Sequence, residues 1–514
     1  MTSADPRSAL SHPAENMPVR LGTAEQFARV RRFFHDVGFN DGTVSSVLNI
    51  PDMSRAVGIG RETLDIASVS PALLAAIDLF VLGIAIPAGD FRAACGEETH
   101  AAFAALNLIR ETKNSAGAQA GAIVCPVWLY PVDGFLAASD RHDDADGGIY
   151  RPPGDAVFPA LDAGTLKLLR LLPAARGADT LDLCGGCGIG ALHFSRTARH
   201  AVTADITARS AYFAEFNGQL NAAGIENLRG DLYQPVAGRQ FDVIAAHPPW
   251  VPSTGDAMVF RDGGEVGEAV IRRIIEGIPN HLRADGTAVI VSLGRDAIEA
   301  AYERRVRGWL GEPGNDCDVI LGVEKTLTIE DVIGSMRKLH LKDDADEANR
   351  MAARFRSFGT DKFVYGALFI RRTDRPVTEP PLRLRMSSRA TAADFERLFS
   401  WRMHRRGPGF RDWLMAAKPR LAAHLEVNVR HAVKEGALVA GTATLSAEYA
   451  FSTALRSDAW TLPLISGFDG RRSVEQIFNQ ARKAKHVPGN FTLFRFMDFV
   501  ALAIEQGFLD VSDQ

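Results

Sequence analysis

Two cysteines and four glycines in LDLCGGCGIG, residues 181–190, have residue types and a spacing that could do chemistry. Cys184 and Cys187 stand at C-x-x-C spacing, which suits a redox pair or one half of a metal site. A structural metal site needs a second pair of ligands, and the other three cysteines of the chain are single and distant. Four glycines in six residues instead favour a sharp turn or a close backbone approach. No metal is expected here.

A glycine turn between a strand and a helix is also a place where the backbone binds an anion or a nucleotide. Gly186, Gly188 and Ala191 fit the dinucleotide pattern G-x-G-x-x-A. Asp205 ends the next predicted strand, where a carboxylate can bind ribose hydroxyls. These residues alone suit NAD and S-adenosylmethionine equally well.

The residues that separate these two cofactors follow the later predicted strands. Asp231 comes after the third strand, and the fourth runs directly into His247-Pro248-Pro249-Trp250. Two prolines at a strand end stiffen the backbone and remove two N–H donors, so that carbonyl groups can face a ligand. The neighbouring tryptophan offers a flat stacking surface. This arrangement suits a planar amine or amide better than hydride transfer.

Residues from about 160 to 372 resemble class I S-adenosylmethionine-dependent methyltransferases of the small-domain group. That group includes the release-factor glutamine methyltransferases and several rRNA and DNA amino-methyltransferases. The resemblance rests on a set of motifs in a fixed order: D-x-C-G-G-C-G at 182–188, Asp205, GD at 230–231, HPPW at 247–250 and FRDGGEVG at 260–267.

The resemblance implies a role for each residue of the cofactor site. Asp182, Gly186 and Gly188 would line the methionine part of S-adenosylmethionine. Asp205 would bind the ribose hydroxyls, and Asp231 would contact the adenine amino group. The resemblance therefore implies S-adenosylmethionine as the cofactor of an N-methyltransferase.

The resemblance also implies that His247, Pro248, Pro249 and Trp250 form the catalytic motif. Two positions depart from the family. Cys184, within the cofactor-binding turn, replaces the usual first glycine, and His247 replaces the usual Asn or Asp. The carbonyl of Pro248 would accept a hydrogen bond from an N–H group of the methyl acceptor. A ring nitrogen of His247 would accept a second such hydrogen bond. His247 as a general base, or as a residue that only orients the loop, are the alternatives.

The expected acceptor is a planar nitrogen (amide, guanidine or amino) of a protein or a small molecule. Two other classes stay open: an rRNA or tRNA amino-methyltransferase, and a regulator that binds S-adenosylmethionine without catalysis. The net charge of −4 disfavours nucleic acid as a partner. The last 130 residues, with about six more basic than acidic groups, keep that alternative open. Neither the acceptor nor the oligomeric state is given by the sequence.

Alternating strands and helices must position these motifs. From residue 160 onward, short β-rich runs such as TLDLC, AVTADI and FDVIAAH are separated by helical stretches. This alternation predicts a Rossmann-like, doubly wound α/β sheet. Pro-rich and polar stretches suggest the domain boundaries. We expect a disordered tail over 1–19, a helical, winged-helix-like domain over 20–150, the methyltransferase domain over 151–375 and a winged-helix-like domain over 383–514.

Composition is ordinary for a globular protein, at 46% hydrophobic and 23% charged residues over 514 positions. Five scattered cysteines and an N-terminus without a basic, then apolar, start predict a cytoplasmic protein without a signal peptide. The most apolar segment, SPALLAAIDLFVLGIAIP, is interrupted by Asp78, Gly83 and Pro87. It predicts a buried helix rather than a membrane span. The charged segment LKDDADEANRMAARFRSFG predicts a surface helix.

Overall fold

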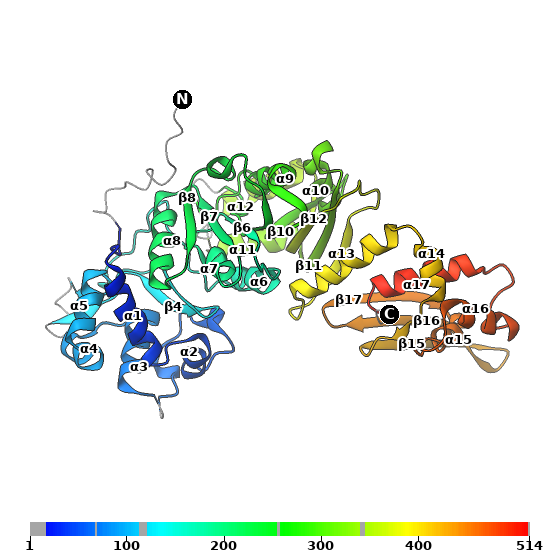
Figure 1. Ribbon diagram of the computed structural model, residues 1–514, viewed down its shortest axis with the longest axis horizontal. Helices are drawn as coiled ribbons and strands as arrows, with labels where there is room; N and C mark the ends of the chain where they lie inside the picture. The colour runs from blue at the N-terminus through cyan, green and yellow to red at the C-terminus, as the bar shows by residue number, and fades with distance from the viewer. Residues whose placement is uncertain (1–16, 67–68, 113–120, 254–257, 340–344, 512–514) are drawn as a thin grey trace. The chain divides into compact units, whose positions relative to one another are not determined.

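The computed structural model describes residues 17–66, 69–112, 121–253, 258–339 and 345–511, coloured along the chain in Figure 1. They divide into two compact units. The first comprises Met1–Val319 and Thr326–Pro380, and the second comprises Ile320–Lys325 and Pro381–Gln514. Most of the predicted N-terminal tail, residues 1–16, lies outside the described residues.

A twisted sheet in the order β8-β7-β6-β9-β10-β12 forms the centre of the first unit. The neighbours from β8 to β10 are parallel, and β12 runs antiparallel to β10. The strands are β6 (Asp179–Leu183), β7 (His200–Asp205), β8 (Ile225–Arg229), β9 (Phe241–Ala246), β10 (Leu282–Ala297) and β12 (Thr360–Arg372). Their near-continuous apolar runs suit parallel strands covered on both faces. The predicted doubly wound α/β class is confirmed.

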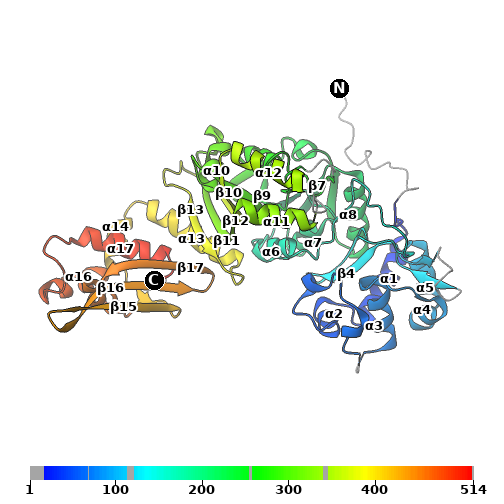
Figure 2. The same ribbon diagram turned by 180° about the vertical axis from the view of Figure 1, so that it is seen from behind.

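Helices cover both faces of this sheet, with α9 and α10 in front in Figure 1 and α11 and α12 in front in Figure 2. The helices are α6 (Ala163–Leu171), α7 (Ile189–Ser195), α8 (Ala208–Leu220), α9 (Ala269–His281), α10 (Tyr302–Leu310), α11 (Ile329–Leu339) and α12 (Ala345–Ser357). The prediction of a surface helix for α12 was incomplete. Its Met351 and Phe355 are fully buried, because the charged residues occupy only the opposite face.

The N-terminal part of the first unit is mainly helical and ends in a β-hairpin. Its helices are α1 (Ala24–Asp36), α2 (Asp41–Val47), α3 (Pro71–Ala76, continued as a π-helix over Ile77–Val81), α4 (Ala88–Cys95) and α5 (Glu97–Ala105). Its strands are β1 (Ile86–Pro87), β2 (Arg110–Glu111), β3 (Ala122–Val124), β4 (Trp128–Val132) and β5 (Phe135–Ser139). Strands β4 and β5 pair antiparallel across a turn at Asp133 and Gly134. In the described part of the chain, no helix has both the length and the apolar character to cross a membrane.

Helix α8 joins this N-terminal part to the sheet. Phe27 of α1 packs edge-on against Phe216 of α8, with ring centroids 5.2 Å apart. Asn217, fully buried, exchanges two hydrogen bonds with the backbone of Ala138 in β5 and donates a third to the carbonyl of Cys187 at 2.9 Å. One side chain therefore ties the hairpin to the glycine turn.

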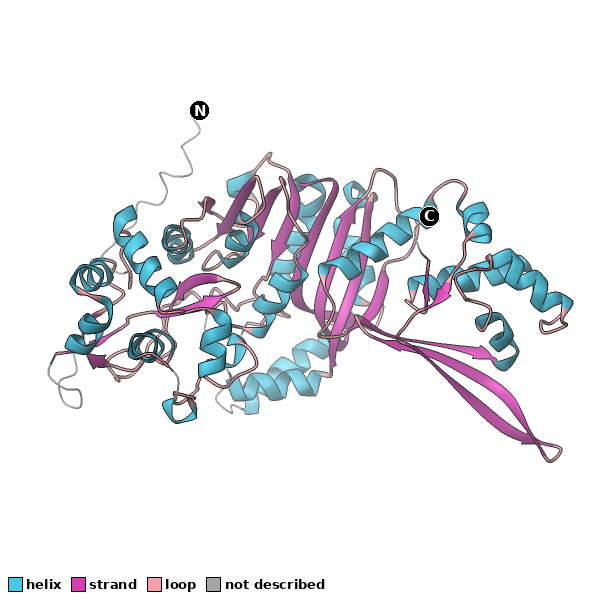
Figure 3. Cartoon of the chain, turned by 60° about the horizontal axis from the view of Figure 1, so that its bottom comes forward, coloured by secondary structure: helices cyan, strands magenta, loops and turns pink. Residues whose placement is uncertain are grey.

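The second unit combines an antiparallel sheet with a small helical layer. The sheet runs β13-β17-β16-β15, and Ile320–Val323 of β11 (Cys317–Leu327) pairs parallel with β13. Its elements are β13 (Leu382–Met386), α13 (Ala392–Arg406), α14 (Phe410–Ala416), β14 (Arg420–Leu421), β15 (Leu425–Lys434), β16 (Ala437–Glu448), β17 (Phe451–Asp458), α15 (Leu462–Ile465), α16 (Val474–Lys483), α17 (Leu493–Glu505) and β18 (Leu509–Asp510). The unit ends in helix α16, a loop, helix α17 and the short strand β18. The long strands β15 and β16, visible in Figure 3, were not predicted.

Candidate active site

The glycine turn between β6 and α7 has a left-handed backbone at three positions. Cys184, Gly186 and Gly188 have φ values of 56°, 53° and 82°. A Cβ atom on Gly188 would lie 2.9 Å from the Cβ of Ala214 on α8, so the close packing of α8 on the turn requires glycine there. Cys184 adopts this conformation without being glycine, at a cost of about 1–2 kcal/mol.

Two carboxylates, the buried Asp182 and the partly buried Asp205, hold the turn through hydrogen bonds. Asp182, 4% exposed, accepts the N–H of Ala191 in the first turn of α7 at 3.2 Å. Asp205, at the end of β7, accepts the N–H groups of Gly186 and Thr207, each at 3.0 Å. The pKa of Asp182 is raised to about 7, mainly by burial; the charge of Asp205 adds to the shift, and hydrogen bonds from the backbone oppose it. Burial also raises the pKa of Asp205.

These two carboxylates suit a ligand that brings positive charge and hydroxyl groups. Within the described ranges, the hydrogen bonds to Asp182 and Asp205 come from backbone N–H and hydroxyl groups, not from a cation. A buried carboxylate without a cation is costly, and a cationic ligand would reduce that cost. S-adenosylmethionine carries a sulfonium, an ammonium and two ribose hydroxyls, so these residues fit it.

The predicted cofactor residues meet around the thiol of Cys184. Burial raises its pKa well above the usual value, and the charges of Asp205, Asp182 and Asp231 add to the effect. Asp231, just after β8, accepts a hydrogen bond from Arg273 of α9 at 2.7 Å. The fold thus brings residues from the carboxyl ends of β6, β7 and β8 to one place. A thiol with such a pKa is protonated and unreactive at neutral pH.

The motif His247–Trp250 follows β9 at the same edge of the sheet. The chain after it folds back on itself: Val251 donates its N–H to the carbonyl of Arg261 at 2.8 Å. The hydroxyl of Ser253 donates to the carboxylate of Asp262 at 2.6 Å. The glycine-rich segment 260–267 is therefore hydrogen-bonded to the residues that follow the predicted catalytic motif.

His247 contacts the first turn of α6. Its Nδ1 lies 3.2 Å from the hydroxyl oxygen of Thr165. Burial lowers the pKa of His247; the charge of Asp162 opposes this shift, and that of Lys167 adds to it. The ring is therefore neutral at neutral pH. Nothing in the sequence pattern had singled out α6 as part of the site.

Trp250 stands beside an aromatic and cationic pair. Its ring centroid is 6.2 Å from that of Tyr365 on β12, at an interplanar angle of 55°. The ammonium of Lys167 lies 4.1 Å from the Tyr365 ring centroid, a cation–π contact. Trp250 also packs against the apolar cluster of α11 and α12 that includes Met351 and Phe355. The helix pair before β12 thus supports the predicted stacking residue.

A buried ion-pair network supports the end of the glycine-rich segment. Glu268, 5% exposed, accepts the backbone N–H of Arg295 at 2.8 Å. Its carboxylate also pairs with the guanidinium of Arg295 at 3.1 Å and that of Arg305 at 2.7 Å. These contacts join the loop to β10 and α10. Sequence reasoning missed them, because the three residues stand at no recognisable spacing.

Comparison with known proteins assigns the domain that carries this site. Residues 154–307 match the family model of the methyltransferase small domain. This segment is a methyltransferase small domain. The family and its cofactor class, S-adenosylmethionine, were predicted from the motif order, and both are confirmed. Within the described ranges, no group of three or more His, Cys, Asp or Glu residues is arranged to hold a metal ion.

The relatives of this methyltransferase domain are similar over part of their length. A ribosomal protein uL3 glutamine methyltransferase of Bradyrhizobium diazoefficiens is 30% identical over 159 residues, covering 27% of this chain and 48% of the relative. A release factor glutamine methyltransferase of Gloeobacter violaceus is 27% identical over 161 residues, covering 26% of this chain and 56% of that relative. The chain spans about half the length of these relatives.

A solved structure of the T. thermophilus 16S rRNA N2 G1207 methyltransferase is also similar to this chain, at 19% sequence identity. The match covers 44% of this chain and 58% of that one, with a TM-score of 0.25.

Proposed function

We propose that the protein transfers a methyl group from S-adenosylmethionine to a planar side-chain nitrogen of a protein. The observation that carries the proposal is the position of His247–Trp250 at the carboxyl end of β9, beside β6 and its glycine turn. The two relatives are glutamine methyltransferases of a ribosomal protein and of a release factor, and this similarity favours an amide nitrogen.

The cofactor side of the site would use the residues that surround the glycine turn. Asp182, Gly186 and Gly188 would hold the methionine part, and Asp205 the ribose hydroxyls. Asp231 would receive the adenine amino group while Arg273 orients its carboxylate. S-adenosylmethionine supplies an activated methyl group on a cationic sulfur. Burial raises the pKa of Asp182 and Asp205, and a bound cation would lower it again, so both groups would face the cofactor as carboxylates.

The acceptor side must draw electron density onto the nitrogen and hold it in line. An amide lone pair is delocalised, so carbonyl groups that accept its N–H hydrogens favour attack. The carbonyl of Pro248 serves this purpose, because Pro249 has no N–H and holds the backbone stiff. Trp250 offers a surface on which the flat group stacks. Positioning of this kind supplies a large part of the rate of a two-substrate reaction.

The second candidate function is methylation of an RNA base amino group. It is favoured by a pocket of about 290 Å³ in the second unit, lined among others by Arg405, Phe410, Arg411 and Phe494. The guanidinium of Arg411 lies 5.3 Å from the ring centroid of Phe494, which is 61% exposed. Arginine beside an exposed aromatic ring suits a stacked base and its phosphate.

Labelled S-adenosylmethionine distinguishes these functions. The protein would be incubated with the cofactor and a size-fractionated cell extract, with protease-treated and RNase-treated samples in parallel. We expect protease-sensitive label in a protein, and mass spectrometry should place the new methyl on a side-chain nitrogen. Label removed by RNase would favour the RNA candidate. Cofactor binding without any transfer would indicate a regulator, and a methyl on carbon or sulfur would overturn the planar-nitrogen acceptor.

A further inference from the structure

The first turn of α6 has a shape that accommodates the His247 ring. Gly164 is the second residue of this helix, and a Cβ atom there would lie 2.7 Å from Cε1 and 2.8 Å from Nε2 of His247. The next residue, Thr165, places its hydroxyl 3.2 Å from Nδ1. The whole nitrogen-bearing edge of the ring therefore faces α6, and the ring bridges the end of β9 and the start of α6.

We propose that Gly164 and Thr165 form a seat for His247, and that His247 is a positioning residue that holds the Pro248 carbonyl in place. Gly164 leaves the space for the ring, and Thr165 holds it through Nδ1. This assignment rests on the proposed function, because it names what His247 does in methyl transfer. It separates the three alternatives of hydrogen-bond acceptor, general base and orienting residue in favour of the last.

The geometry explains why histidine can replace the Asn that the family usually carries. Nδ1 of histidine and the terminal atoms of asparagine are the same number of bonds from Cα. An asparagine at position 247 can therefore reach Thr165 with its side-chain amide. A general base would need a ring nitrogen directed at the acceptor, yet both nitrogens face the helix.

Burial keeps the His247 ring neutral by lowering its pKa. The charge of Asp162, the N-cap of α6, opposes this shift, and that of Lys167, one turn further on, adds to it. A neutral ring keeps its contact with Thr165 across neutral pH. A ring displaced from the seat would lose its burial, so its pKa would return towards the ordinary value.

Gly164→Ala tests the seat. Its Cβ would also lie 2.7 Å from Oδ2 of Asp162, the N-cap that accepts the Gly164 N–H, so this cap must shift as well. The higher helix propensity of alanine offsets part of that cost, and the φ of Gly164 is not in the left-handed region. The added methyl group should displace the ring. The matched control is Gly89→Ala, because Gly89 is also the second residue of a helix and has nothing within 4 Å of its added Cβ.

Two further variants test the hydroxyl. Thr165→Val keeps the shape of the side chain and removes the hydrogen bond, whereas Thr165→Ser keeps the hydroxyl and should rescue the wild-type behaviour. All variants should bind S-adenosylmethionine as tightly as the wild type does, measured by calorimetry.

The primary measurement needs no acceptor. With carbon-13 at the imidazole Cε1 positions of the 13 histidines, NMR titration follows each ring, and the His247 signal is the one missing in His247→Asn. We expect a low pKa in the wild type, Gly89→Ala and Thr165→Ser, and a pKa raised towards the ordinary value in Gly164→Ala. Thr165→Val should shift the Cε1 signal by changing the tautomer. Unchanged His247 signals in both Gly164→Ala and Thr165→Val would overturn the seat.

Turnover on the fraction that the wild type labels tests the role of the seat. Gly164→Ala should lower kcat by about 10²-fold, as expected for a reacting group displaced by about 1 Å. An unchanged kcat, with the His247 signal displaced, would overturn the positioning role. If the wild-type protein labels nothing, the proposed function fails. The NMR titration still tests whether Gly164 and Thr165 hold the His247 ring, because it needs no acceptor.

Discussion

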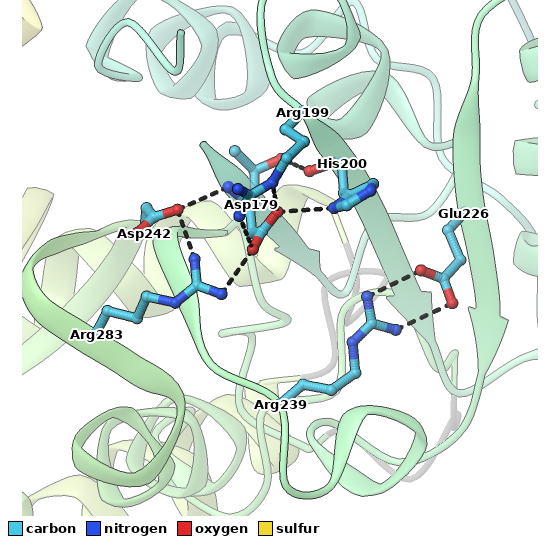
Figure 4. Close-up of polar contacts among 8 residues, drawn as sticks. Asp179, Arg199, His200, Glu226, Arg239, Asp242 and Arg283 are labelled. Atoms are coloured by element: carbon cyan, nitrogen blue, oxygen red, sulfur yellow. Dashed lines mark hydrogen bonds and ion pairs between the residues drawn. The ribbon is translucent and has the colours of Figure 1, made fainter. Parts of the chain in front are cut away.

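Two aspartates on β6 lie three residues apart, and the pKa values of their carboxyl groups are shifted in opposite directions. Asp179, at the start of the strand, pairs with Arg199, His200 and Arg283, as Figure 4 shows. Hydrogen bonds from Arg199 above all, then from Arg283 and His200, hold its pKa far below the ordinary value. Asp182, near the end of the same strand, is buried among backbone groups, and its pKa is raised to about 7.

The two edges of the sheet repeat this difference. At the amino edge, Asp242 shares Arg283 with Asp179, and Glu226 forms a two-pronged pair with Arg239 (Figure 4). At the carboxyl edge, Asp205 joins Asp182 in having a raised pKa. Asp231, which pairs with Arg273, is the exception at the carboxyl edge. Carboxylates that cations of the protein balance contribute to stability, whereas unbalanced ones suit a site for a ligand. The following predictions test this division.

The largest expected effect is at the carboxyl edge, in His247→Ala. Without the ring, the Pro248 carbonyl would no longer be held in position, and we expect kcat to fall by about 10²-fold. His247→Asn should recover most of that loss, because its amide can still reach Thr165. Since the pKa of His247 is lowered, wild-type activity should persist below the ordinary pKa of histidine. Steady-state kinetics over a pH series would check this, and His247→Asn activity as low as that of alanine would mean that a titrating base is required.

The next largest effect is expected for Asp205→Ala, in cofactor affinity. Removal of a carboxylate that binds ribose hydroxyls should weaken S-adenosylmethionine binding by about 1–3 kcal/mol, the range for hydrogen bonds to a charged group. Calorimetry measures this directly. Stability should change little, because the protein itself supplies no cation to Asp205. If Asp205→Ala instead lowered the melting temperature strongly and left the affinity for S-adenosylmethionine unchanged, Asp205 would be a stabilising residue like Asp179, and the proposed difference between the two edges would be wrong.

Asp182 gives the cofactor affinity a pH dependence. A cationic ligand favours the ionised carboxylate, so binding should release a proton, and affinity should rise by up to about tenfold per unit until the pH passes about 7. The stability of the folded protein depends on pH in the opposite direction to the cofactor affinity. Because the folded pKa is raised, the unliganded protein loses stability as the pH rises through about 7. Calorimetry in buffers of different ionisation enthalpy should show proton release that Asp182→Asn abolishes.

Asp179→Asn is the matched substitution at the amino edge. We expect a loss of about 1 kcal/mol in the free energy of unfolding, since Arg199 and Arg283 are partly exposed and such pairs contribute little. Because the folded pKa of Asp179 is lowered, this contribution is present at neutral pH and is lost as the pH falls. Denaturant unfolding at two pH values would measure it. Cofactor affinity should stay at the wild-type value, and a weakened affinity would count against the division.

Sequence reasoning reached the cofactor side of the site more completely than the acceptor side. Strand, glycine turn and helix follow one another within residues 179–195, so local pattern was enough to predict them. The seat of His247 was not predictable, because Thr165 and Gly164 lie in a helix far from it in sequence. Such a contact depends on how α6 packs, not on any spacing along the chain.

The same reason explains the errors outside the site. The buried face of α12 was missed because its charged residues dominate the composition, although Met351 and Phe355 stand at helical spacing. In the second unit, β15 does begin with an apolar–polar alternation over Leu425–Arg430, which was not used in the prediction, whereas β16 carries mixed apolar, small and polar residues. Each pairs with its neighbour through backbone groups, which any sequence can supply.

The smallest effect is expected for the double substitution of Cys184 and Cys187 by serine. Both thiols are free, and burial raises the pKa of Cys187 to about 12, so neither is available as a thiolate at neutral pH. Serine is of similar size, and affinity for S-adenosylmethionine should change by less than about 0.5 kcal/mol. Calorimetry and elemental analysis would check the prediction together. Stoichiometric zinc in the wild type that disappears in the double variant would show instead that the turn is a metal site. Cys184→Gly is a further control. Glycine relieves the left-handed backbone strain of the folded state, but it also raises the entropy of the unfolded chain. These two effects oppose each other, so the free energy of unfolding should stay close to that of the wild type.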